Sequence, residues 1–365
     1  MNEETQGGAG PEAFGAEKAP PAFSEFLQKL SERRDLARAE AGQALEQMID
    51  GMASDVEMGA FLMAMRIKGE TAEEIAGLLE TMRRAAIPVE TPHPEALVDI
   101  VGTGGDRLGT FNISTSAALV VAGAGVKVAK HGNRAASSRC GSADVLEALG
   151  VCVDLTPTEV ATCLDQVGMG FMLASQYHPA MGRVAGVRST LGIRTVFNIL
   201  GPLTNPAGVQ RLLVGVSSSE HLEVLGGALA RVGCLHALVV HSDEGMDEIS
   251  VSSANTVVEV ERGVVQPPYS LSPEECGVSR WALAGLLGGE PAENATITRE
   301  VLKGAGGARR DAVLVNAGAA LYVAGAVSSI KAGIDLAAAT IDEGRAAKLL
   351  EDLADLTNRL AEART

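Results

Sequence analysis

The sequence predicts an α/β protein in which a small all-helical domain precedes a larger α/β domain with a mostly parallel central sheet flanked by helices. Three observations lead to this prediction. Residues 23–90 have a helical pattern with short connections, and Pro88, Pro92 and Pro94 then mark a linker. Beyond the linker, short apolar runs alternate with helical stretches, an order typical of a parallel sheet. The 42 glycines cluster at the turns between these segments, where an α/β protein places them.

The composition narrows the class of protein. A length of 365 residues corresponds to about two domains. The net charge of −16 argues against nonspecific binding to nucleic acid or to an anionic membrane surface. Five cysteines without a C-x-x-C spacing fit a reducing cytosol better than a zinc ribbon or a disulfide scaffold. No run approaches the roughly 18 apolar residues of a membrane span. We therefore expect a cytoplasmic protein with neither nucleic acid nor membrane as a partner.

The N-terminal part divides into an extension and a group of helices. Residues 1–22 are acidic and rich in Gly, Ala and Pro, so a disordered extension is expected there. Two capping boxes, Ser54–Glu57 and Thr71–Glu74, predict the starts of two helices, one over 56–68 and one that runs to about Arg84.

The α/β part contains apolar runs of strand length separated by helical patterns. The predicted strands are Leu97–Val101, Val126–Ala129, Val151–Leu155, Phe171–Leu173, Leu212–Val216, Ala237–Val240 and Thr256–Val260. The predicted helices between them include Ala143–Leu149, Glu159–Val167 and Glu220–Arg231, with capping boxes at Thr156–Glu159 and Ser217–Glu220. The Ala/Leu-rich tail predicts packing helices over Asp311–Ala324 and Leu336–Leu360.

The segment His178–Pro206 interrupts this alternation. We expect it to leave the sheet and to pack on the N-terminal helices. The expected domains are therefore an extension over 1–22, a helical domain over 23–93 completed by about 179–206, and an α/β domain formed by 94–178 and 207–365.

Two glycine-rich loops carry the strongest chemical signal. Gly102–Asp106 (GTGGD) and Lys130–Arg134 (KHGNR) each follow a predicted strand and lead toward a helix. Glycines let the backbone approach a ligand closely, and free N–H groups at a helix start attract anions. Standard signatures are missing, because Arg107 stands at the third glycine position of a Rossmann motif and no Gly-Lys dipeptide offers a Walker loop. Two such loops predict a ligand with two anionic groups.

The residues that follow each loop add hydrogen-bonding groups. Asn112, Ser114 and Thr115 would stand at a helix N-terminus, where ordinary capping explains them equally well in isolation. The loop just upstream favours ligand binding. The second loop continues into Ser137-Ser138 and Gly141–Asp144, a set too dense in donors for a simple solvated turn.

Carboxylates and a cation complete the candidate residues. Asp247 and Glu248 follow a predicted strand, and oxygen ligands there suit Mg²⁺ together with substrate phosphates. For the neighbouring Asp243 and Glu244 a solvated acidic loop is the better interpretation. Arg188 could clamp a planar carboxylate with two hydrogen bonds, although a single helical arginine more often lies on the surface.

Six separated motifs together resemble the anthranilate phosphoribosyltransferases of tryptophan biosynthesis, and their order and spacing agree with that family from about residue 25 to the C-terminus. The motifs are Gly102–Asp106, Thr110–Thr115, Lys130–Arg134 with Ser137 and Ser138, Gly141–Asp144, Asn198–Pro206 and Asp247–Glu248. The resemblance implies a homodimer with the active site in the cleft of each subunit. It also implies that anthranilate and 5-phosphoribosyl-1-diphosphate yield N-(5-phosphoribosyl)anthranilate and pyrophosphate, with two Mg²⁺ ions.

The same resemblance implies roles for individual residues. The expected phosphoribosyl-diphosphate site is Gly102, Gly105, Asp106, Thr110, Asn112, Ile113, Ser114, Thr115, Lys130, His131, Gly132, Asn133, Arg134, Ala135, Ala136, Ser137, Ser138 and Ser142. The expected metal ligands are Ser114, Asp247 and Glu248. The expected anthranilate contacts are Gly102, Asn133 and Arg188, with His131 and His178 as neighbours. Lys130, Arg188 and Asn133 are the expected catalytic residues.

Three positions depart from the family pattern. Arg107 and Ser242 stand where glycines are usual, and Gly186 stands where a proline is frequent; none of them removes an expected ligand. Two rival functions remain: a pyrimidine nucleoside phosphorylase and a noncatalytic relative that binds nucleic acid. The KHGNR loop and the Asp247–Glu248 pair favour a diphosphate donor with metal over the first, and the net charge of −16 weighs against the second.

Overall fold

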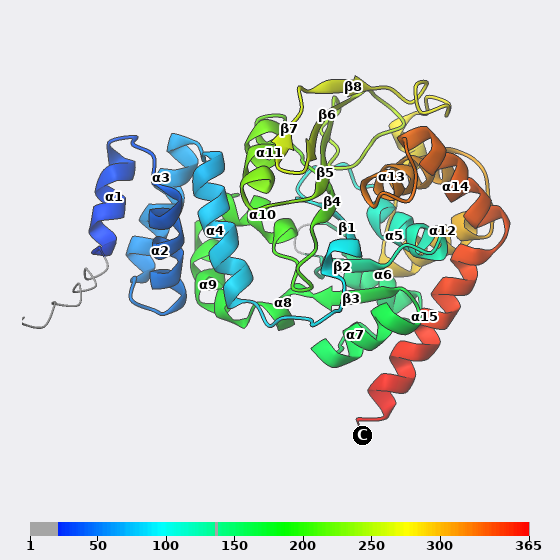
Figure 1. Ribbon diagram of the computed structural model, residues 1–365, viewed down its shortest axis with the longest axis horizontal. Helices are drawn as coiled ribbons and strands as arrows, with labels where there is room; N and C mark the ends of the chain where they lie inside the picture. Colours follow the sequence, from blue (N-terminus) through cyan, green and yellow to red (C-terminus); the bar gives the residue numbers. More distant parts are fainter. Residues whose placement is uncertain (1–20, 136–137, 365) are drawn as a thin grey trace, which may run out of the picture.

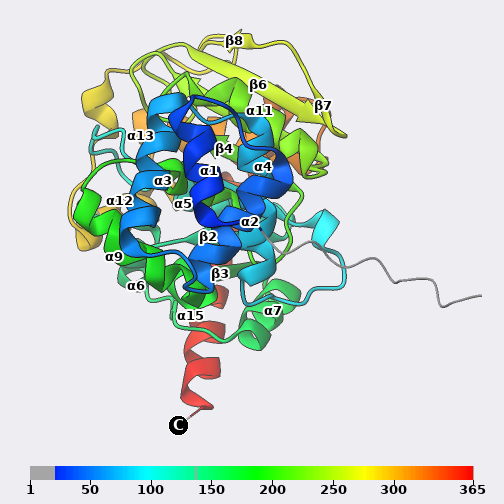
Figure 2. The ribbon, with the colours of Figure 1, turned by 90° about the vertical axis from the view of Figure 1, so that its left-hand side faces the viewer.

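The computed structural model describes residues 21–135 and 138–364. Helices α1 to α4 form one end of the molecule, a central sheet follows, and the C-terminal helices lie on the far side (Figure 1). From the side of the helical end, α1 to α4 lie in front of the sheet (Figure 2).

The α-helices are α1 Phe23–Ser31, α2 Arg38–Ile49, α3 Asp55–Lys68, α4 Ala72–Ala85, α5 Ile113–Gly123, α6 Ser142–Ala148, α7 Pro157–Gln166, α8 Ala174–Tyr177, α9 Gly182–Leu191, α10 Val196–Leu200, α11 His221–Arg231, α12 Pro291–Leu302, α13 Ala308–Val323, α14 Ile330–Asp342 and α15 Arg345–Glu362. Short 3₁₀ helices are η1 Pro94–Ala96, η2 Pro179–Met181, η3 Gly201–Leu203 and η4 Leu283–Leu286. The strands are β1 Val98–Gly102, β2 Val128–Gly132, β3 Met169–Leu173, β4 Arg211–Gly215, β5 His236–Ser242, β6 Asn255–Glu261, β7 Val264–Val265 and β8 Tyr269–Leu271.

The sheet is mostly parallel, as the sequence predicts. Its strand order is β3-β2-β1-β4-β5-β6-β7, with β8 also paired to β6. The pairs from β3 to β5 are parallel, and β6 then runs antiparallel to β5. Helices α5 and α13 pack on β1, whereas α11 packs on β5 and β6. Helices α11 and α13 lie on opposite sides of the strands (Figure 1), so the sheet is covered on both faces and the fold class is confirmed.

Helix starts in the N-terminal part follow the predicted capping boxes. The Ser54 hydroxyl accepts the backbone N–H of Glu57, while the Glu57 carboxylate accepts the Ser54 N–H at 2.8 Å. Thr71 and Glu74 repeat the arrangement at the start of α4. Gly69 ends α3 with φ of 87°, a backbone angle at which glycine is favoured.

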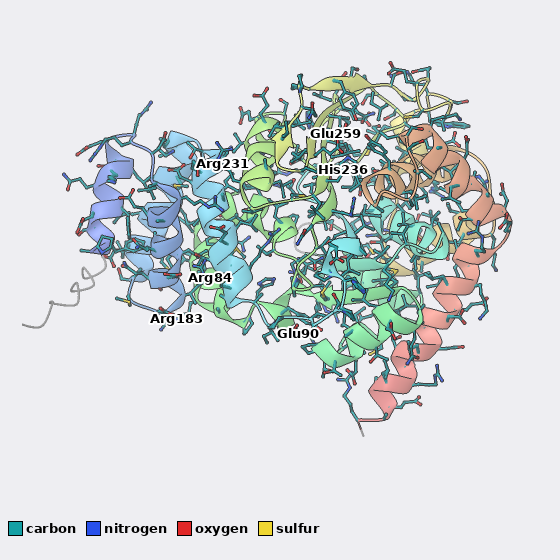
Figure 3. All side chains as sticks on the ribbon, viewed as in Figure 1. Arg84, Glu90, Arg183, Arg231, His236 and Glu259 are labelled. Carbon is teal, nitrogen blue, oxygen red and sulfur yellow. The ribbon has the colours of Figure 1, made fainter. Side chains whose placement is uncertain are left out.

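The segment from α9 to η3 lies against the N-terminal helices. Helix α9 packs on α2 and α3, and α10 packs on α3 and α4. The guanidinium of Arg83 in α4 donates to the carbonyl oxygen of Leu203 at 2.9 and 3.1 Å. At the other end of α4, Arg231 of α11 forms an ion pair with Glu73 at 2.6 Å, where the two helices meet (Figure 3). These contacts join the helical end to the sheet-bearing part.

Some predicted elements were wrong. Residues Val151–Leu155 are a buried extended loop without a strand partner, and the Cys152 N–H donates to the Thr357 hydroxyl at 3.0 Å instead of to a neighbouring strand. Their alternating apolar side chains are buried as in a strand, which explains the error. The helix predicted over 336–360 is broken by Gly344, whose φ of 73° separates α14 from α15.

Two further differences bear on the site. Strand β2 extends to Gly132, so Lys130 and His131 belong to a strand and not to a loop. The predicted capping box at Ser217–Glu220 does not form, because Ser217 donates its hydroxyl to the Gly104 carbonyl at 3.2 Å.

Within residues 21–135 and 138–364, no helix is long and apolar enough to cross a membrane. The five cysteines, Cys140, Cys152, Cys163, Cys234 and Cys276, are all free thiols.

Candidate active site

Two glycines at neighbouring strand ends make room for the acidic pair. Gly102 of β1 and Gly215 of β4 are paired in register. A Cβ on Gly102 would lie 2.2 Å from a carboxylate oxygen of Asp247, and one on Gly215 would lie 1.7 Å from the Asp247 carbonyl oxygen. A side chain at either position would overlap Asp247. The absence of side chains at these strand ends therefore lets Asp247 lie across the carboxyl edge of the sheet.

The first glycine-rich loop is held against this carboxylate. The Gly104 N–H donates to Asp247 at 2.6 Å. The loop needs left-handed backbone angles, with φ of 67° at Gly104, 81° at Gly105 and 59° at Arg107. Arg107 thus adopts a conformation that normally favours glycine, which is the residue usual there in the family pattern. The Asp106 carboxylate accepts the Leu108 N–H at 3.3 Å.

The second carboxylate connects to the start of α5. Glu248 accepts the Ser114 N–H at 3.1 Å, in the first turn of that helix. Burial and the neighbouring Asp247 charge raise the pKa of Glu248 to about 8, against an opposing effect of Lys130. Burial and the Asp106 charge raise the pKa of Asp247 to about 7. These raised pKa values mean that negative charge on the two carboxylates is unfavourable in their buried surroundings. A bound cation would stabilise that negative charge.

Lys130 is buried in strand β2 and does not lie on a loop surface. Its side chain is 2% exposed, and its ammonium donates to the Ile100 carbonyl at 2.6 Å. Burial lowers the Lys130 pKa, while the charges of Asp99 and Glu248 act in the opposite direction. Asp99 is itself buried, which raises its pKa to about 6. The structure therefore places Lys130 inside the sheet, between a buried carboxylate and the candidate metal ligands.

The two histidines expected near anthranilate lie side by side. The rings of His131 and His178 are 5.1 Å apart, and both residues are buried. Burial, the adjacent His178 and Lys130 lower the pKa of His131 to about 3. Among the described residues, the Nε2 atom of His131 has no hydrogen-bond partner. His131 therefore offers a buried, neutral nitrogen.

The second glycine-rich loop is tied to α6. Ser142 donates its hydroxyl to the Asn133 carbonyl at 3.2 Å, and Asp144 accepts the Ala135 N–H at 2.9 Å. Arg134 forms a two-bond ion pair with Glu147 at 2.6 and 2.7 Å, so its guanidinium is engaged within the loop region. Ser138 donates to the Cys140 carbonyl at 3.5 Å. Ala136 and Ser137, also expected in this site, lie outside the described residues.

Other residues expected to bind the donor have distinct positions. Thr110 forms a β-bridge with Leu287. Asn112 stands before α5 without capping it and donates its amide to the Cys140 carbonyl at 3.2 Å. Ile113 is buried in the core, and the buried Thr115 hydroxyl has no hydrogen-bond partner among the described residues. The Ile113 side chain therefore serves packing.

Arg188 makes no ion pair or hydrogen bond with the described residues of either glycine-rich loop, and its guanidinium lies over an aromatic ring. Its guanidinium carbon is 5.5 Å from the ring centre of Phe197, and burial lowers its pKa. Within the described parts of the chain it makes no ion pair with a carboxylate. A guanidinium that lies over an aromatic ring and has no carboxylate partner can form two parallel hydrogen bonds with the planar carboxylate of a ligand.

Several residues that form hydrogen bonds with the candidate site or its neighbours were not predicted from the sequence. Arg194 donates to the Gly104 carbonyl at 2.6 Å and to the Thr103 carbonyl at 3.3 Å. Asn205 donates to Asp99 at 2.8 Å and to the Ala129 carbonyl at 2.7 Å. Asn205 lies inside the Asn198–Pro206 motif and Arg194 lies outside every motif named from the sequence, and nothing in the sequence identifies the partners of either residue.

The acidic loop was only partly predicted. Asp243 is exposed as expected. Glu244 is not simply solvated, because it accepts the hydroxyls of Ser250 and Ser252. Asn316 of α13 makes two hydrogen bonds with Ile249: it accepts the Ile249 N–H at 3.0 Å and donates to the Ile249 carbonyl at 2.9 Å. Asn316 was not among the candidates predicted from the sequence. The part of the chain that the structure describes contains no group of three or more His, Cys, Asp or Glu side chains arranged for a metal.

Two family profiles match the two parts of the chain. The profile described as "Glycosyl transferase family, helical bundle domain" matches residues 24–86. The profile described as "Glycosyl transferase family, a/b domain" matches residues 94–347.

Curated relatives and solved structures agree with these profiles. The anthranilate phosphoribosyltransferase of Rubrobacter xylanophilus is 50% identical over 338 residues, which is 92% of this chain and 98% of that protein. The crystal structure of the Thermus thermophilus enzyme has a TM-score of 0.86 and 45% identity, covering 91% of this chain and 99% of the other. The Saccharomyces cerevisiae enzyme in complex with PRPP and Mg has a TM-score of 0.84 and 30% identity, covering 93% and 98%. The resemblance seen in the motifs is confirmed, and the chain belongs to the anthranilate phosphoribosyltransferase family.

Proposed function

We propose that this chain transfers the 5-phosphoribosyl group from 5-phosphoribosyl-1-diphosphate to the amine of anthranilate and releases pyrophosphate. The observation that carries the proposal is the position of Asp247 and Glu248. One carboxylate accepts an N–H of the first glycine-rich loop, and the other accepts an N–H at the start of α5. The proposal is supported by yeast relatives, whose structures were solved with PRPP and Mg and with 4-fluoroanthranilate.

The residues present fit Mg²⁺. Asp247 and Glu248 are adjacent carboxylates whose pKa values are raised by burial and by neighbouring negative charge, and the Ser114 N–H donates to Glu248. We assign these three residues as its ligands, with two ions bound when the diphosphate is present. Mg²⁺ bound there would neutralise the negative charge of the diphosphate as it leaves.

The chain's own contribution to the donor site is electrostatic. The loop of Gly102–Asp106 and the start of α5 offer backbone N–H groups to anions. Lys130 adds a buried positive charge behind the carboxylates, in a region where charge interactions are weakly screened. Fixed charges and dipoles of this kind favour a leaving group that gathers negative charge, and they need no rearrangement during the reaction.

Anthranilate needs positioning more than activation. Its aromatic amine is neutral at pH 7 and already nucleophilic, so no strong base has to remove its proton before attack. We assign its carboxylate to Arg188, whose guanidinium has no carboxylate partner among the described residues and is stacked on Phe197. His131, neutral because of its lowered pKa, and Asn133 of the second loop would orient the amine toward the sugar.

We extend the proposal to the assembly and location. The helical domain over 23–93 with 179–206 would form the far wall of the cleft, against an α/β domain of 94–178 and 207–365. A homodimer through the helical end would cover Met52, Val56 and Ile67, which are 64%, 82% and 64% exposed. Free thiols at all five cysteines are compatible with the cytoplasm.

An anthranilate fluorescence assay tests the function. The purified chain should consume anthranilate only when both 5-phosphoribosyl-1-diphosphate and Mg²⁺ are present, and pyrophosphate should appear in equal amount. Consumption of thymidine or uridine with inorganic phosphate, in place of this reaction, would identify the phosphorylase instead. No turnover of anthranilate by folded protein with donor and Mg²⁺ would refute the proposal.

A further inference from the structure

Three hydrogen bonds in series connect α12 to Asn112 and Cys140, which follow the first and the second glycine-rich loop in the chain. The Gly289 N–H donates to Asn294 Oδ1 at 2.7 Å, and Asn294 Nδ2 donates to Asn112 Oδ1 at 2.9 Å. Asn112 Nδ2 then donates to the Cys140 carbonyl at 3.2 Å. Asn294 is 1% exposed, so water cannot replace its partners. We call these four residues the amide relay.

The direction of the amide relay is fixed by its ends. Gly289 contributes a backbone N–H, which can only donate, and Cys140 contributes a backbone carbonyl, which can only accept. The amides of Asn294 and Asn112 must therefore both point the same way along the series. Exchanging the oxygen and nitrogen positions of either side-chain amide would place two donors or two acceptors opposite each other. The relay has one arrangement, and each member depends on the next.

The last two members of the amide relay, Asn112 and Cys140, are close in the chain to candidate site residues. Asn112 is two residues before Ser114, whose N–H donates to Glu248. Cys140 is followed by Gly141 and by Ser142, whose hydroxyl donates to the Asn133 carbonyl. The chain before α12 also pairs with the end of the first loop, through Phe111 N–H to the Leu286 carbonyl at 3.0 Å and Gly288 N–H to the Gly109 carbonyl at 2.9 Å.

We propose that Asn294 is a positioning residue that holds the two glycine-rich loops in one relative arrangement, so that both can bind a diphosphate donor together. This inference rests on the proposed function for its kinetic consequence. Asn294 touches neither candidate ligand nor candidate metal residue. It acts through Asn112, which follows the first glycine-rich loop in the chain and donates to Cys140, which follows the second.

Thr298 provides a matched control. It lies one turn along α12 from Asn294, is also 1% exposed, and its hydroxyl pairs with Ser116 of α5 at 2.9 Å. Thr298→Val therefore removes a buried hydrogen bond between α12 and α5 without touching the amide relay. Asn294→Leu removes both bonds of the relay with little change of shape. Asn294→Asp keeps an acceptor for the Gly289 N–H but places a carboxylate oxygen, in place of the amide donor, opposite Asn112 Oδ1, and it serves if the leucine variant does not fold.

Hydrogen exchange of the unliganded chain tests the structural claim without any assay of activity. In the Asn294 variant, backbone amides of residues 104–112 and 138–144 should both exchange at least about tenfold faster than in wild type, since a broken buried hydrogen bond is worth about that factor. In Thr298→Val both segments should keep wild-type rates. Faster exchange confined to residues 288–296 would overturn the relay.

Kinetics test its consequence. Asn294→Asp should raise the KM for 5-phosphoribosyl-1-diphosphate about tenfold, with a smaller change in the KM for anthranilate. Asn112→Ala and Asn294→Ala should not be additive, because either one breaks the same series. Additive losses, or an equal loss in Thr298→Val, would contradict the relay. A wild-type chain without transferase activity would refute the proposed function, whereas the exchange experiment would still decide the relay.

Discussion

The carboxylate of Asp247 accepts the backbone N–H of Gly104 at 2.6 Å, although 143 positions separate the two residues in the chain. This bond joins the acidic pair directly to the first glycine-rich loop. Gly102 and Gly215 make it possible, because any side chain at these strand ends would occupy the place of Asp247. A change at one strand end should therefore reach the candidate metal site and the candidate donor site together.

Gly215→Ala tests this dependence. Its Cβ would lie 1.7 Å from the Asp247 carbonyl oxygen, so the acidic pair must move away from the loop. We expect the Mg²⁺ concentration for half-maximal activity to rise about 10- to 100-fold, as when groups that orient metal ligands are lost. Gly123→Ala is the control, because its Cβ would come 2.9 Å from Ala346 Cα in α15, away from the site. Equal Mg²⁺ requirements in both variants would show that only packing was disturbed.

Arg188→Ala should separate the two substrates kinetically. Loss of the guanidinium would leave the anthranilate carboxylate unpaired, and the KM for anthranilate should rise about 10- to 100-fold. The KM for 5-phosphoribosyl-1-diphosphate should change less than about threefold, because Arg188 makes no ion pair or hydrogen bond with the described residues of either glycine-rich loop. Arg183→Ala, on the exposed side of the same helix, should match wild type in initial-rate measurements. A parallel increase of both KM values in Arg188→Ala would reject the assignment.

Local signals in the sequence predicted the frame of the fold well. The capping boxes at Ser54 and Thr71 act within four residues, so their side-chain bonds could be inferred without the rest of the chain. The alternation of strands and helices likewise predicted the parallel sheet, although the second glycine-rich segment begins within β2 and not after it. Val151–Leu155 was misassigned because its pattern is that of a strand, while no neighbouring strand among the described residues pairs with it.

The supports of the site could not be predicted in this way. Three asparagines form side-chain hydrogen bonds with groups far away in the sequence, such as the carbonyls of Ala129 and Ile249; they are Asn205, Asn294 and Asn316. An isolated asparagine gives no signal of this kind, since its usual role is in turns and caps. The chemistry of Asp247 and Glu248 could be inferred from their residue types, but their raised pKa values depend on burial that only the fold creates.

Asn316→Leu tests the support of the acidic pair. Asn316 holds Ile249, the residue after Glu248, with bonds of 3.0 and 2.9 Å. Without them Ile249 keeps two unsatisfied buried backbone groups, and the free energy of unfolding should fall by about 1–3 kcal/mol. Half-maximal activity should also require about tenfold more Mg²⁺. Thr357→Val removes a hydroxyl that accepts the Cys152 N–H and should lower stability only. An unchanged Mg²⁺ titration of Asn316→Leu, measured on folded protein, would exclude a role in positioning.

His131 should make the chain less stable in acid. Its pKa in the folded chain is about 3, lowered from 6.5 by burial and by the neighbouring His178 and Lys130. Between these values the unfolded chain binds a proton that the folded chain does not. The free energy of unfolding therefore loses up to about 1.4 kcal/mol per pH unit as the pH falls below the unfolded value.

His131→Asn lacks this proton uptake, so wild type should lose stability relative to the variant as the pH falls. Urea unfolding at about pH 6.5, 5.5 and 4.5 measures the difference. Asp99, with its pKa raised to about 6, acts in the opposite direction, because the folded chain takes up its proton first. That contribution is present in both proteins and cancels in the comparison. A constant difference in the free energy of unfolding across the three pH values would mean that His131 is protonated in the folded chain as readily as in water.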